Sequence, residues 1–317
     1  MGGGTFLVSL PKEWAKKNGI TKGSLLGLEE VSPRKIIIGP VENTRKEVRE
    51  AVIGYTQANV DEIVNDLTGK YLLGYDIIRI ESRSLIERHG RAKLKEAARR
   101  LIGLEIVDED SKKITFQFLL EERGLEPEKL VRRMAKITEG MLRDIMDGCS
   151  TLDTSLFQAV GERDDELDRL YFLLVRTLRS ASVRPDVLES YGLTITELLD
   201  YRVLASYLEN IGDASNNLAG WLERIDEREF IEKIARCMEQ ILIMHERSIM
   251  LFLLARKKEY QRASYEEINK ISKQLSIQIG EIAEKSEGRK ESVEVLSTLL
   301  RLSNIFVDIA DLTIPSE

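Results

Sequence analysis

Side chains that commonly serve as metal ligands, nucleophiles or disulfide partners are scarce in this sequence. Its 317 residues include two cysteines, Cys149 and Cys237, and two histidines, His89 and His245. Two distant cysteines argue against a disulfide framework or a cysteine-rich zinc site, and they suit a reducing cytoplasm. Neither histidine follows a glutamate by three residues, so the ligand pattern of a ferritin-like di-iron bundle is missing as well.

Long apolar runs and a strong charge of one sign are also missing. No apolar run approaches the roughly 18 residues of a membrane-spanning helix, and no signal-peptide pattern is visible at the N-terminus. The formal net charge is −7, so any contact with DNA must come from a local basic patch. With 43% apolar and 32% charged residues, the composition is that of a folded, helix-rich protein.

The opening residues are predicted to form a small module containing strands. Residues 5–10 (TFLVSL) have the composition of a strand, and Pro11 begins a basic helix with Ser9 as its expected N-cap. Residues 24–38 indicate a hairpin. Because 40 residues cannot bury both faces of such strands, we expect this module to form a homodimer.

A small α+β linking domain is predicted to follow. The pattern indicates a helix over 47–71, a strand over 76–81, a basic helix over 91–102 and a hairpin over 104–118. This region shows no set of side chains typical of a reactive site.

From Pro127 onward the sequence is predicted to be helical and internally repeated. Apolar residues at steps of three and four define long helices, each with one apolar face. Three blocks of residues recur in the same order at offsets of 101, 101 and 94 residues. This repetition indicates two three-helix bundles in tandem, with His245 as an ordinary residue on a helix surface.

Acidic residues occupy unusual positions on two of these helices. Asp164 fills a gap in an apolar stripe, and Asp168 lies one turn further along the same side. Glu209 and Asp213 repeat this spacing on the third helix, and Asn217 adds an amide oxygen four residues later. Like charges so placed repel each other unless a cation or a proton joins them.

Two interpretations of these acids stay open on spacing alone. In one, their oxygens hold a hard cation such as Mg²⁺ or Mn²⁺, or iron. In the other, they form solvated faces with ion pairs to Arg163, Arg169 or Arg202. Because the chain has 54 acidic residues, about nine pairs at this spacing are expected by chance.

The same residues resemble the PhoU family of phosphate-uptake regulators, which are tandem three-helix bundles marked by an E(D)xxxD motif. The motif stands at 164–168 and 209–213, and the string YLENIGDASNNLA at 207–219 is similar to the family's third-helix signature. The resemblance covers about residues 120–317. It implies a divalent or iron-type metal (Fe, Mn, Mg or Zn) bound by Asp164, Asp168, Glu209, Asp213 and Asn217.

The second repeat departs from this pattern. Tyr265 and Asn269 stand where Asp164 and Asp168 stand in the first repeat. The acidic pair of the third helix is not reproduced in register either, so the resemblance does not extend to a second metal site.

The opening stretch GGGTFLVSLPKEWAKKNGITKGSLLGLEE resembles AbrB/SpoVT-type modules, which dimerise by swapping hairpins and often bind DNA. Family members usually have a further strand before the glycines, and here Met1 directly precedes Gly2. The residues expected to contact DNA phosphates are Lys12, Lys16, Lys17, Lys22 and Arg34. The alternative is a dimerisation module without a role at DNA.

Together the two resemblances indicate a regulator of the archaeal type and a mainly α fold. The expected domains are a swapped-hairpin-like β module (1–42), an α+β linking domain (43–122) and PhoU-like bundles at 123–225 and 226–317. No nucleophile–base set or phosphate-binding loop is present in the sequence, so no enzymatic activity is expected.

The predicted function is cytoplasmic regulation of phosphate uptake by a metal-binding homodimer that contacts promoter DNA and does not insert into a membrane. The alternative is an adaptor that binds the ATPase subunit of a phosphate transporter, or its signalling partner, and never contacts DNA.

Overall fold

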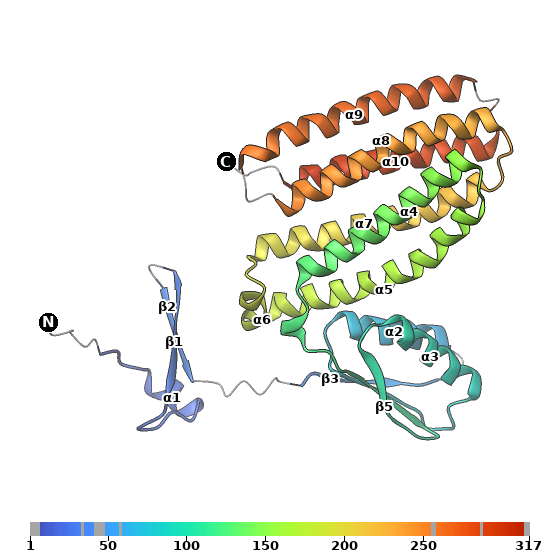
Figure 1. Ribbon diagram of the computed structural model, residues 1–317. Coiled ribbons are helices and arrows are strands. Elements are labelled where there is room, and N and C mark those ends of the chain that lie inside the picture. Colours follow the sequence, from blue (N-terminus) through green and yellow to red (C-terminus); the bar gives the residue numbers. More distant parts are fainter. Residues whose placement is uncertain are drawn as a thin grey trace. The chain divides into compact units, whose positions relative to one another are not determined.

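The protein is mainly α-helical, as predicted. The structure is a computed structural model, and it describes residues 7–32, 35–40, 48–56, 59–254, 258–285 and 288–313. Contacts divide the chain into two compact units, residues 1–48 and residues 49–317 (Figure 1). The bounds of the four predicted domains stay a prediction.

The N-terminal unit contains a short helix and a hairpin. Helix α1 is Lys12–Lys17, and strand β1 (Leu26–Ser32) pairs antiparallel with β2 (Lys35–Pro40), which confirms the predicted hairpin. Two details were wrong. Pro11 rather than Ser9 is the N-cap of α1. Residues 7–10 form no strand, because a strand needs a partner for its hydrogen bonds and none is present within this unit's described part; residues 5 and 6 lie outside the described ranges.

The larger unit begins with a four-stranded sheet covered by two helices. We call this part the sheet domain. Its elements are β3 (Glu50–Gly54), α2 (Val60–Leu72), β4 (Ile77–Glu81), α3 (Arg88–Arg100), β5 (Leu104–Glu109) and β6 (Lys113–Phe118). The strand order is β3-β4-β6-β5, in which only β3 and β4 run parallel. The expected helix over 47–71 is therefore wrong in its first part, because residues 50–54 extend to pair with β4.

One face of the sheet carries the core of this region. Ile78, Ile80, Ile114 and Phe116 are fully buried there, against Leu67 of α2. Figure 1 shows α2 and α3 between the sheet and the helical region that follows. The core therefore lies next to helix α5, which contributes Leu173 to it.

Two three-helix bundles make up the rest of the unit. The first contains α4 (Pro127–Thr151), α5 (Ser155–Val183), the short α6 (Pro185–Ser190) and α7 (Ile195–Leu222). The second contains α8 (Arg228–Leu253), α9 (Lys258–Lys285) and α10 (Lys290–Asp311). Their buried side chains form one continuous apolar core, which confirms the tandem bundles. Among the described residues, no helix is long and apolar enough to cross a bilayer.

His245 of α8 lies inside this shared core, so its predicted place on a helix surface was wrong. Its side chain is 2% exposed, and Nε2 lies 2.8 Å from Oγ1 of Thr138 in α4. The Thr138 hydroxyl donates its proton to the carbonyl of Ala135, so Nε2 must carry the proton of the neutral imidazole. Burial lowers the pKa of His245 to about 4, so this residue joins the two bundles in its uncharged form.

Candidate functional site

Four carboxylates gather where α5 and α7 meet, and we call them the acid cluster: Asp164, Asp168, Glu209 and Asp213. Burial raises the pKa of Asp164, of Asp168 and of Glu209, and each is raised further by the charges of other members. The two acidic pairs that the sequence shows on separate helices therefore lie beside each other in the structure. The four charges repel each other across the helix–helix contact, so a cation that reaches them is attracted by all four.

Gly212 allows α5 and α7 to approach this closely. A Cβ atom at this position would lie 2.3 Å from Cδ2 of Leu167 and 3.0 Å from Oδ1 of Asp164. Any other residue would push the Asp164 carboxylate and the Leu167 side chain away from α7. The glycine between Glu209 and Asp213 thus places the two acidic pairs beside each other, a role that sequence reasoning missed.

Two members of the acid cluster already have partners. Asn216 donates from Nδ2 to Oδ2 of Asp164 at 2.9 Å, and Arg100 of α3 donates from Nη2 to Oδ2 of Asp168 at 3.0 Å. The predicted ligand Asn217 is exposed, and its amide donates to the backbone carbonyl of Asp213. Asn216, one residue earlier, is therefore the amide that reaches the cluster.

Arginines expected to pair with the acids bind elsewhere. Arg163 forms an ion pair with Asp144 at 2.8 Å. Arg202 donates to Ser206 at 2.6 Å and to Tyr171 at 3.2 Å. The alternative interpretation paired these two arginines with the acids, and in the structure they bind other groups.

The ligand atoms of the acid cluster are of the type that a hard cation prefers, but the side chains are not grouped closely enough to hold one. Carboxylate and amide oxygens are the ligands that Mg²⁺ and Mn²⁺ prefer, and the missing Cβ of Gly212 leaves room for the Asp164 carboxylate beside α7. Within the described ranges, however, no three histidine, cysteine or acidic side chains are grouped to hold a metal ion. A metal would require the acids to turn toward one another. Metal binding, and the metal's identity, stay predictions.

The second bundle offers no comparable set at the matching positions. Asn269 donates from its amide to the backbone carbonyl of Tyr265 at 3.1 Å, along its own helix. Ser272 of α9 and Ser303 of α10 share a hydroxyl hydrogen bond of 2.9 Å across the bundle. Tyr265, Asn269 and Ser303 are thus neutral where the first bundle has Asp164, Asp168 and Glu209.

The basic residues of the N-terminal unit are open to solvent. Lys12, Lys16, Lys17 and Lys22 are all exposed, whereas Arg34 lies outside the described residues. Helix α1 has no buried residue. Their charges are available to an anionic partner.

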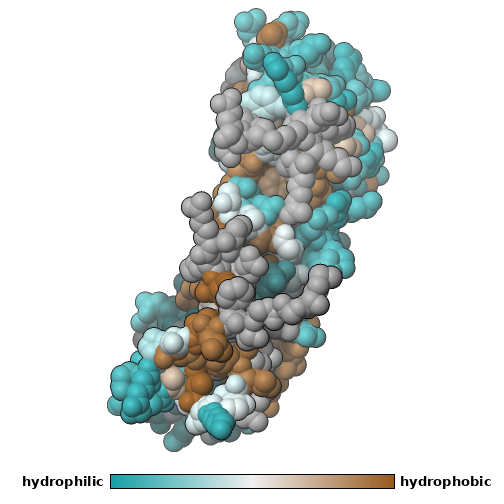
Figure 2. Space-filling model, turned by 90° about the vertical axis from the view of Figure 1, so that its left-hand side faces the viewer, coloured by the Kyte–Doolittle hydropathy of each residue, from teal (hydrophilic) through white to brown (hydrophobic). Residues whose placement is uncertain are grey.

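Apolar side chains of the same unit are also exposed, and Figure 2 draws such residues in brown. The largest of them are Leu7, Val8, Leu25, Leu28 and Ile36. Leu7 is 95% exposed and Leu25 is 81% exposed. Apolar surface of this extent on so small a unit is typical of an interface.

A buried arginine fastens the sheet domain to α5, and the sequence analysis did not identify it. Arg176 is 1% exposed, and its Nη1 donates to the backbone carbonyls of Tyr71 at 2.7 Å and of Tyr75 at 2.9 Å. Its guanidinium carbon lies 3.8 Å from the centre of the Phe118 ring. The charge therefore sits at the C-terminal end of α2, where the helix dipole favours a cation.

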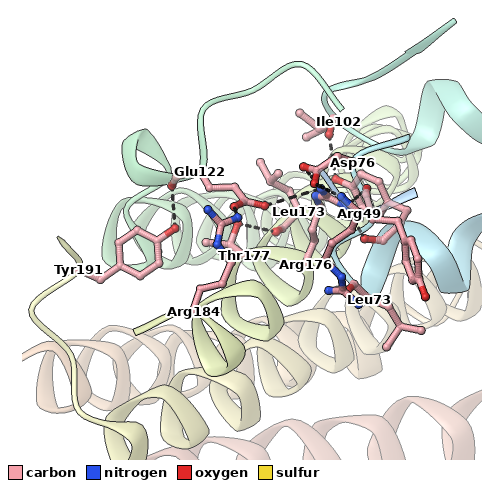
Figure 3. A network of polar contacts seen from close by, with 12 residues as sticks. Arg49, Leu73, Asp76, Ile102, Glu122, Leu173, Arg176, Thr177, Arg184 and Tyr191 are labelled. Atoms are coloured by element: carbon pink, nitrogen blue, oxygen red, sulfur yellow. Dashed lines mark hydrogen bonds and ion pairs between the residues drawn. The ribbon is translucent and has the colours of Figure 1, made fainter. Parts of the chain in front are cut away.

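Glu122 completes this network from the segment that leads into α4 (Figure 3). Its carboxylate lies 3.7 Å from Nη2 of Arg176 and is hydrogen-bonded to Arg184. The Tyr191 hydroxyl donates to the Glu122 backbone carbonyl at 2.7 Å. Contacts between residues tens of positions apart in the chain thus hold the sheet domain against α5 and the turn after α6.

Comparison with protein families identifies two parts of the chain. Residues 131–222 match the PhoU domain, and residues 1–46 match the bacterial antitoxin MazE, a domain of antidote–toxin recognition. The first match spans most of α4 through α7 and includes the whole acid cluster. The N-terminal match agrees with the predicted AbrB-like module.

Two curated relatives come from strains of Caulobacter vibrioides, NA1000/CB15N and ATCC 19089/CB 15. Each is described as a phosphate-specific transport system accessory protein PhoU homologue and is 30% identical over 89 residues, or 28% of this chain. The match spans 36% of each relative's length.

Solved structures with a similar backbone include two PhoU proteins. The phosphate transport system regulatory protein PhoU of Streptococcus pneumoniae aligns with a TM-score of 0.45 at 13% identity, over 59% of this chain and 91% of its own. PhoU of Pseudomonas aeruginosa aligns with a TM-score of 0.41 at 12% identity, over 61% of this chain and 95% of its own.

Proposed function

Because this chain carries a PhoU domain together with a MazE-like N-terminal domain, we propose that it regulates phosphate uptake and acts at promoter DNA. The observation that carries the proposal is the match of residues 131–222, since the relatives that share 30% identity are accessory proteins of phosphate transport. The part played by this chain is regulatory rather than enzymatic.

The N-terminal unit supplies the contact with DNA in this proposal, and it does so as a homodimer. Exposed lysines on α1 and after it suit the phosphates of a duplex, and this local charge acts against a net charge of −7 for the whole chain. Exposed Leu28 on the hairpin and Leu25 directly before it supply part of the surface on which a second copy packs. Pairing also sets two basic helices side by side, as a symmetric site on DNA requires.

A gel-shift assay on promoter DNA of phosphate-transport genes, repeated at several salt concentrations, tests the DNA contact. Replacing Lys12, Lys16 and Lys17 with alanine should weaken binding to all sequences alike. The slope of log affinity against log salt should flatten by about one unit for each phosphate that the variant no longer neutralises.

A matched control removes three exposed lysines from the larger unit: Lys129, Lys136 and Lys273. It should bind DNA as the wild type does, since it loses the same charge elsewhere. If both triple variants bind with the wild-type slope, the N-terminal lysines do not contact DNA. The adaptor that acts on a transporter ATPase would then be the better proposal.

Sedimentation tests the dimer separately. Replacing Leu25 and Leu28 with aspartate should convert the protein to a monomer, because buried charge at an interface without partners is strongly unfavourable. Replacing exposed Leu85 of the larger unit with aspartate should leave the mass unchanged. A wild-type monomer over the whole concentration range would refute the proposed assembly.

We also propose that the acid cluster binds a divalent cation as part of this function. The support is chemical: four carboxylates from two helices lie beside one another, and burial together with their mutual repulsion raises the pKa of Asp164, Asp168 and Glu209. Asp164, Asp168, Glu209 and Asp213 would hold the cation, which would neutralise their repulsion across the contact of α5 and α7.

A further inference from the structure

Strand β3 forms one edge of the four-stranded sheet, and in the described part of the chain no strand pairs with its outer side. The carbonyl of Arg49 accepts from the amide of Ile77 at 3.2 Å, and the amide of Tyr55 donates to the carbonyl of Glu81 at 2.7 Å. In a parallel pair every second residue bonds to the same neighbouring strand. The backbone groups that point away from β4 are therefore those of Glu50, Val52 and Gly54, and none of them has a partner among the described residues.

The opposite edge of the sheet, β5, has features that prevent a further strand from pairing. Its sequence, LEIVDE, has three acidic residues, and its register with β6 is shifted within the strand. Charges and bulges are common means by which proteins block pairing at a sheet edge. Strand β3 has no proline and an unbroken register, and its one charged residue, Glu50, forms an ion pair with Arg79 of β4 at 2.7 Å. The β3 edge is therefore open to another strand, whereas the β5 edge is protected.

We propose that β3 pairs antiparallel with β3 of a second copy, so that the two sheets join edge to edge within the homodimer. This inference rests on the homodimer of the proposed function. Dimerisation of the N-terminal units brings the second strand close, because few residues separate Pro40 at the end of β2 from Glu50 at the start of β3. A short tether gives an effective concentration in roughly the millimolar range, which suits a contact too small to hold a dimer by itself.

A two-fold symmetric register centred on Val52 uses the whole strand. Val52 then lies opposite Val52 of the second copy, and Glu50 lies opposite Gly54 of the second copy, so that the outward backbone groups exchange hydrogen bonds in pairs. The Val52 side chain is 58% exposed, and in this register two valines cover each other at the centre. The two glutamates lie at opposite ends of the contact, so like charges do not face each other. The strand is thus complementary to a copy of itself.

The pairing extends the dimer to the part of the chain that carries the helical bundles. Leu173 of α5 packs into the core of the sheet domain, and Arg176 of α5 donates to the carbonyl of Tyr71 at 2.7 Å. Because α5 is fastened to the sheet domain in this way, joining the sheets of two copies also joins the first bundles through their sheet domains.

Disulfide cross-linking of the full chain with Val52→Cys tests the pairing, and Val107→Cys is the matched control. The Cα atoms of a hydrogen-bonded antiparallel pair lie about 5.5 Å apart, which is within the range that a disulfide spans. Mild oxidation should therefore convert Val52→Cys to a covalent dimer. Val107 is a similarly exposed valine of the β5 edge, so Val107→Cys should stay uncoupled. The native Cys149 and Cys237 are buried and should add little background. Equal cross-linking of the two variants would overturn the pairing.

A mixture of Glu50→Cys and Gly54→Cys tests the register. A Cβ at Gly54 has room, since it would meet no heavy atom of the described residues within 4 Å apart from its chain neighbours. After exchange of subunits the two variants should cross-link to each other. Neither should cross-link alone, because equal positions on the two strands are then about 14 Å apart. Cross-linking of Glu50→Cys with itself, and not with Gly54→Cys, would refute the register centred on Val52.

Failure of the pairing can be told apart from failure of the homodimer. If sedimentation shows a wild-type dimer but Val52→Cys and Val107→Cys cross-link alike, only the pairing is wrong. If the wild type is a monomer and Val52→Cys does not cross-link, the homodimer is wrong and the pairing is refuted with it. If Val52→Cys cross-links, and adding Leu25→Asp and Leu28→Asp abolishes the cross-link, both the homodimer and the pairing are supported.

Discussion

Replacing Arg176 with methionine should destabilise the protein strongly, because this arginine is buried at the contact of the sheet domain with α5. Methionine can fill much of the space of the aliphatic stem, but it cannot donate hydrogen bonds. The carbonyl of Tyr75 then loses the guanidinium donor, the carbonyl of Tyr71 keeps only the backbone N–H of Gly74, and Glu122 keeps only Arg184 as an ionic partner.

The expected loss follows from the burial of these groups. Breaking a buried ion pair by removing one partner typically costs about 3–5 kcal/mol, and an unsatisfied buried carbonyl costs about 1–3 kcal/mol. The guanidinium is itself imperfectly satisfied, since its Nε has no hydrogen-bond partner among the described residues. Its own desolvation is relieved in the variant, so we expect a net loss of about 3–5 kcal/mol rather than the sum.

Urea unfolding followed by circular dichroism measures this loss, and Arg179→Met on the same helix is the control. Arg179 is exposed, so its replacement should change the free energy of unfolding by no more than about 0.5 kcal/mol. Adding Glu122→Gln to Arg176→Met should restore part of the stability, because the buried carboxylate is then neutral. A wild-type unfolding midpoint for Arg176→Met would refute the assigned role.

Two other predictions concern protonation and metal. Burial places the pKa of His245 at about 4, below its ordinary value of 6.5, so the wild type should lose about 3 kcal/mol of stability as the pH falls from about 6.5 to about 4. His245→Met should show a correspondingly smaller loss in urea melts across this range, and an unchanged pH dependence would mean that His245 titrates normally. Mn²⁺ should raise the melting temperature of the wild type and of Asn269→Ala, but not of Asp164→Asn/Asp168→Asn. A full metal-induced rise in that double variant would exclude the acid cluster as the site.

The sequence predicts an element correctly where its structure depends on residues close together in the chain. The apolar period of residues 195–221 predicts a helix there, and α7 runs over Ile195–Leu222. Its start is fixed by Thr194 and Glu197, which hydrogen-bond to each other's backbone amides in a capping box. Its length follows from apolar residues on one face, so both signals lie within the segment itself.

The sequence does not predict elements and contacts that depend on residues far apart in the chain. The local pattern predicts a helix through residues 50–54, because their partner strand β4 begins more than 20 residues later in the chain. Arg176 stands inside the apolar run LLVRTL, which was the only sign that a charge is buried there. Its partners could not be identified from the sequence, because the carbonyls of Tyr71 and Tyr75 lie about a hundred residues earlier.

The acid cluster was predicted in part, and His245 could have been predicted better. The i,i+4 acids identified the right faces of α5 and α7, but the roles of Gly212, Asn216 and Arg100 depend on the distance between helices. His245 lies four residues after the buried Ile241. The apolar period of α8 therefore already placed it in the core.

Helix α5 limits how this architecture can be recombined with other proteins. Leu173 packs into the core of the sheet domain, while the next residue, Leu174, packs into the bundle. A PhoU domain excised at Pro127 would carry Phe172, Leu173 and Arg176 into solvent. Fusing these bundles to a different N-terminal domain would therefore require substitutions on the face of α5 that contacts the sheet domain. The sheet domain and the bundles are thus transferable only as one unit.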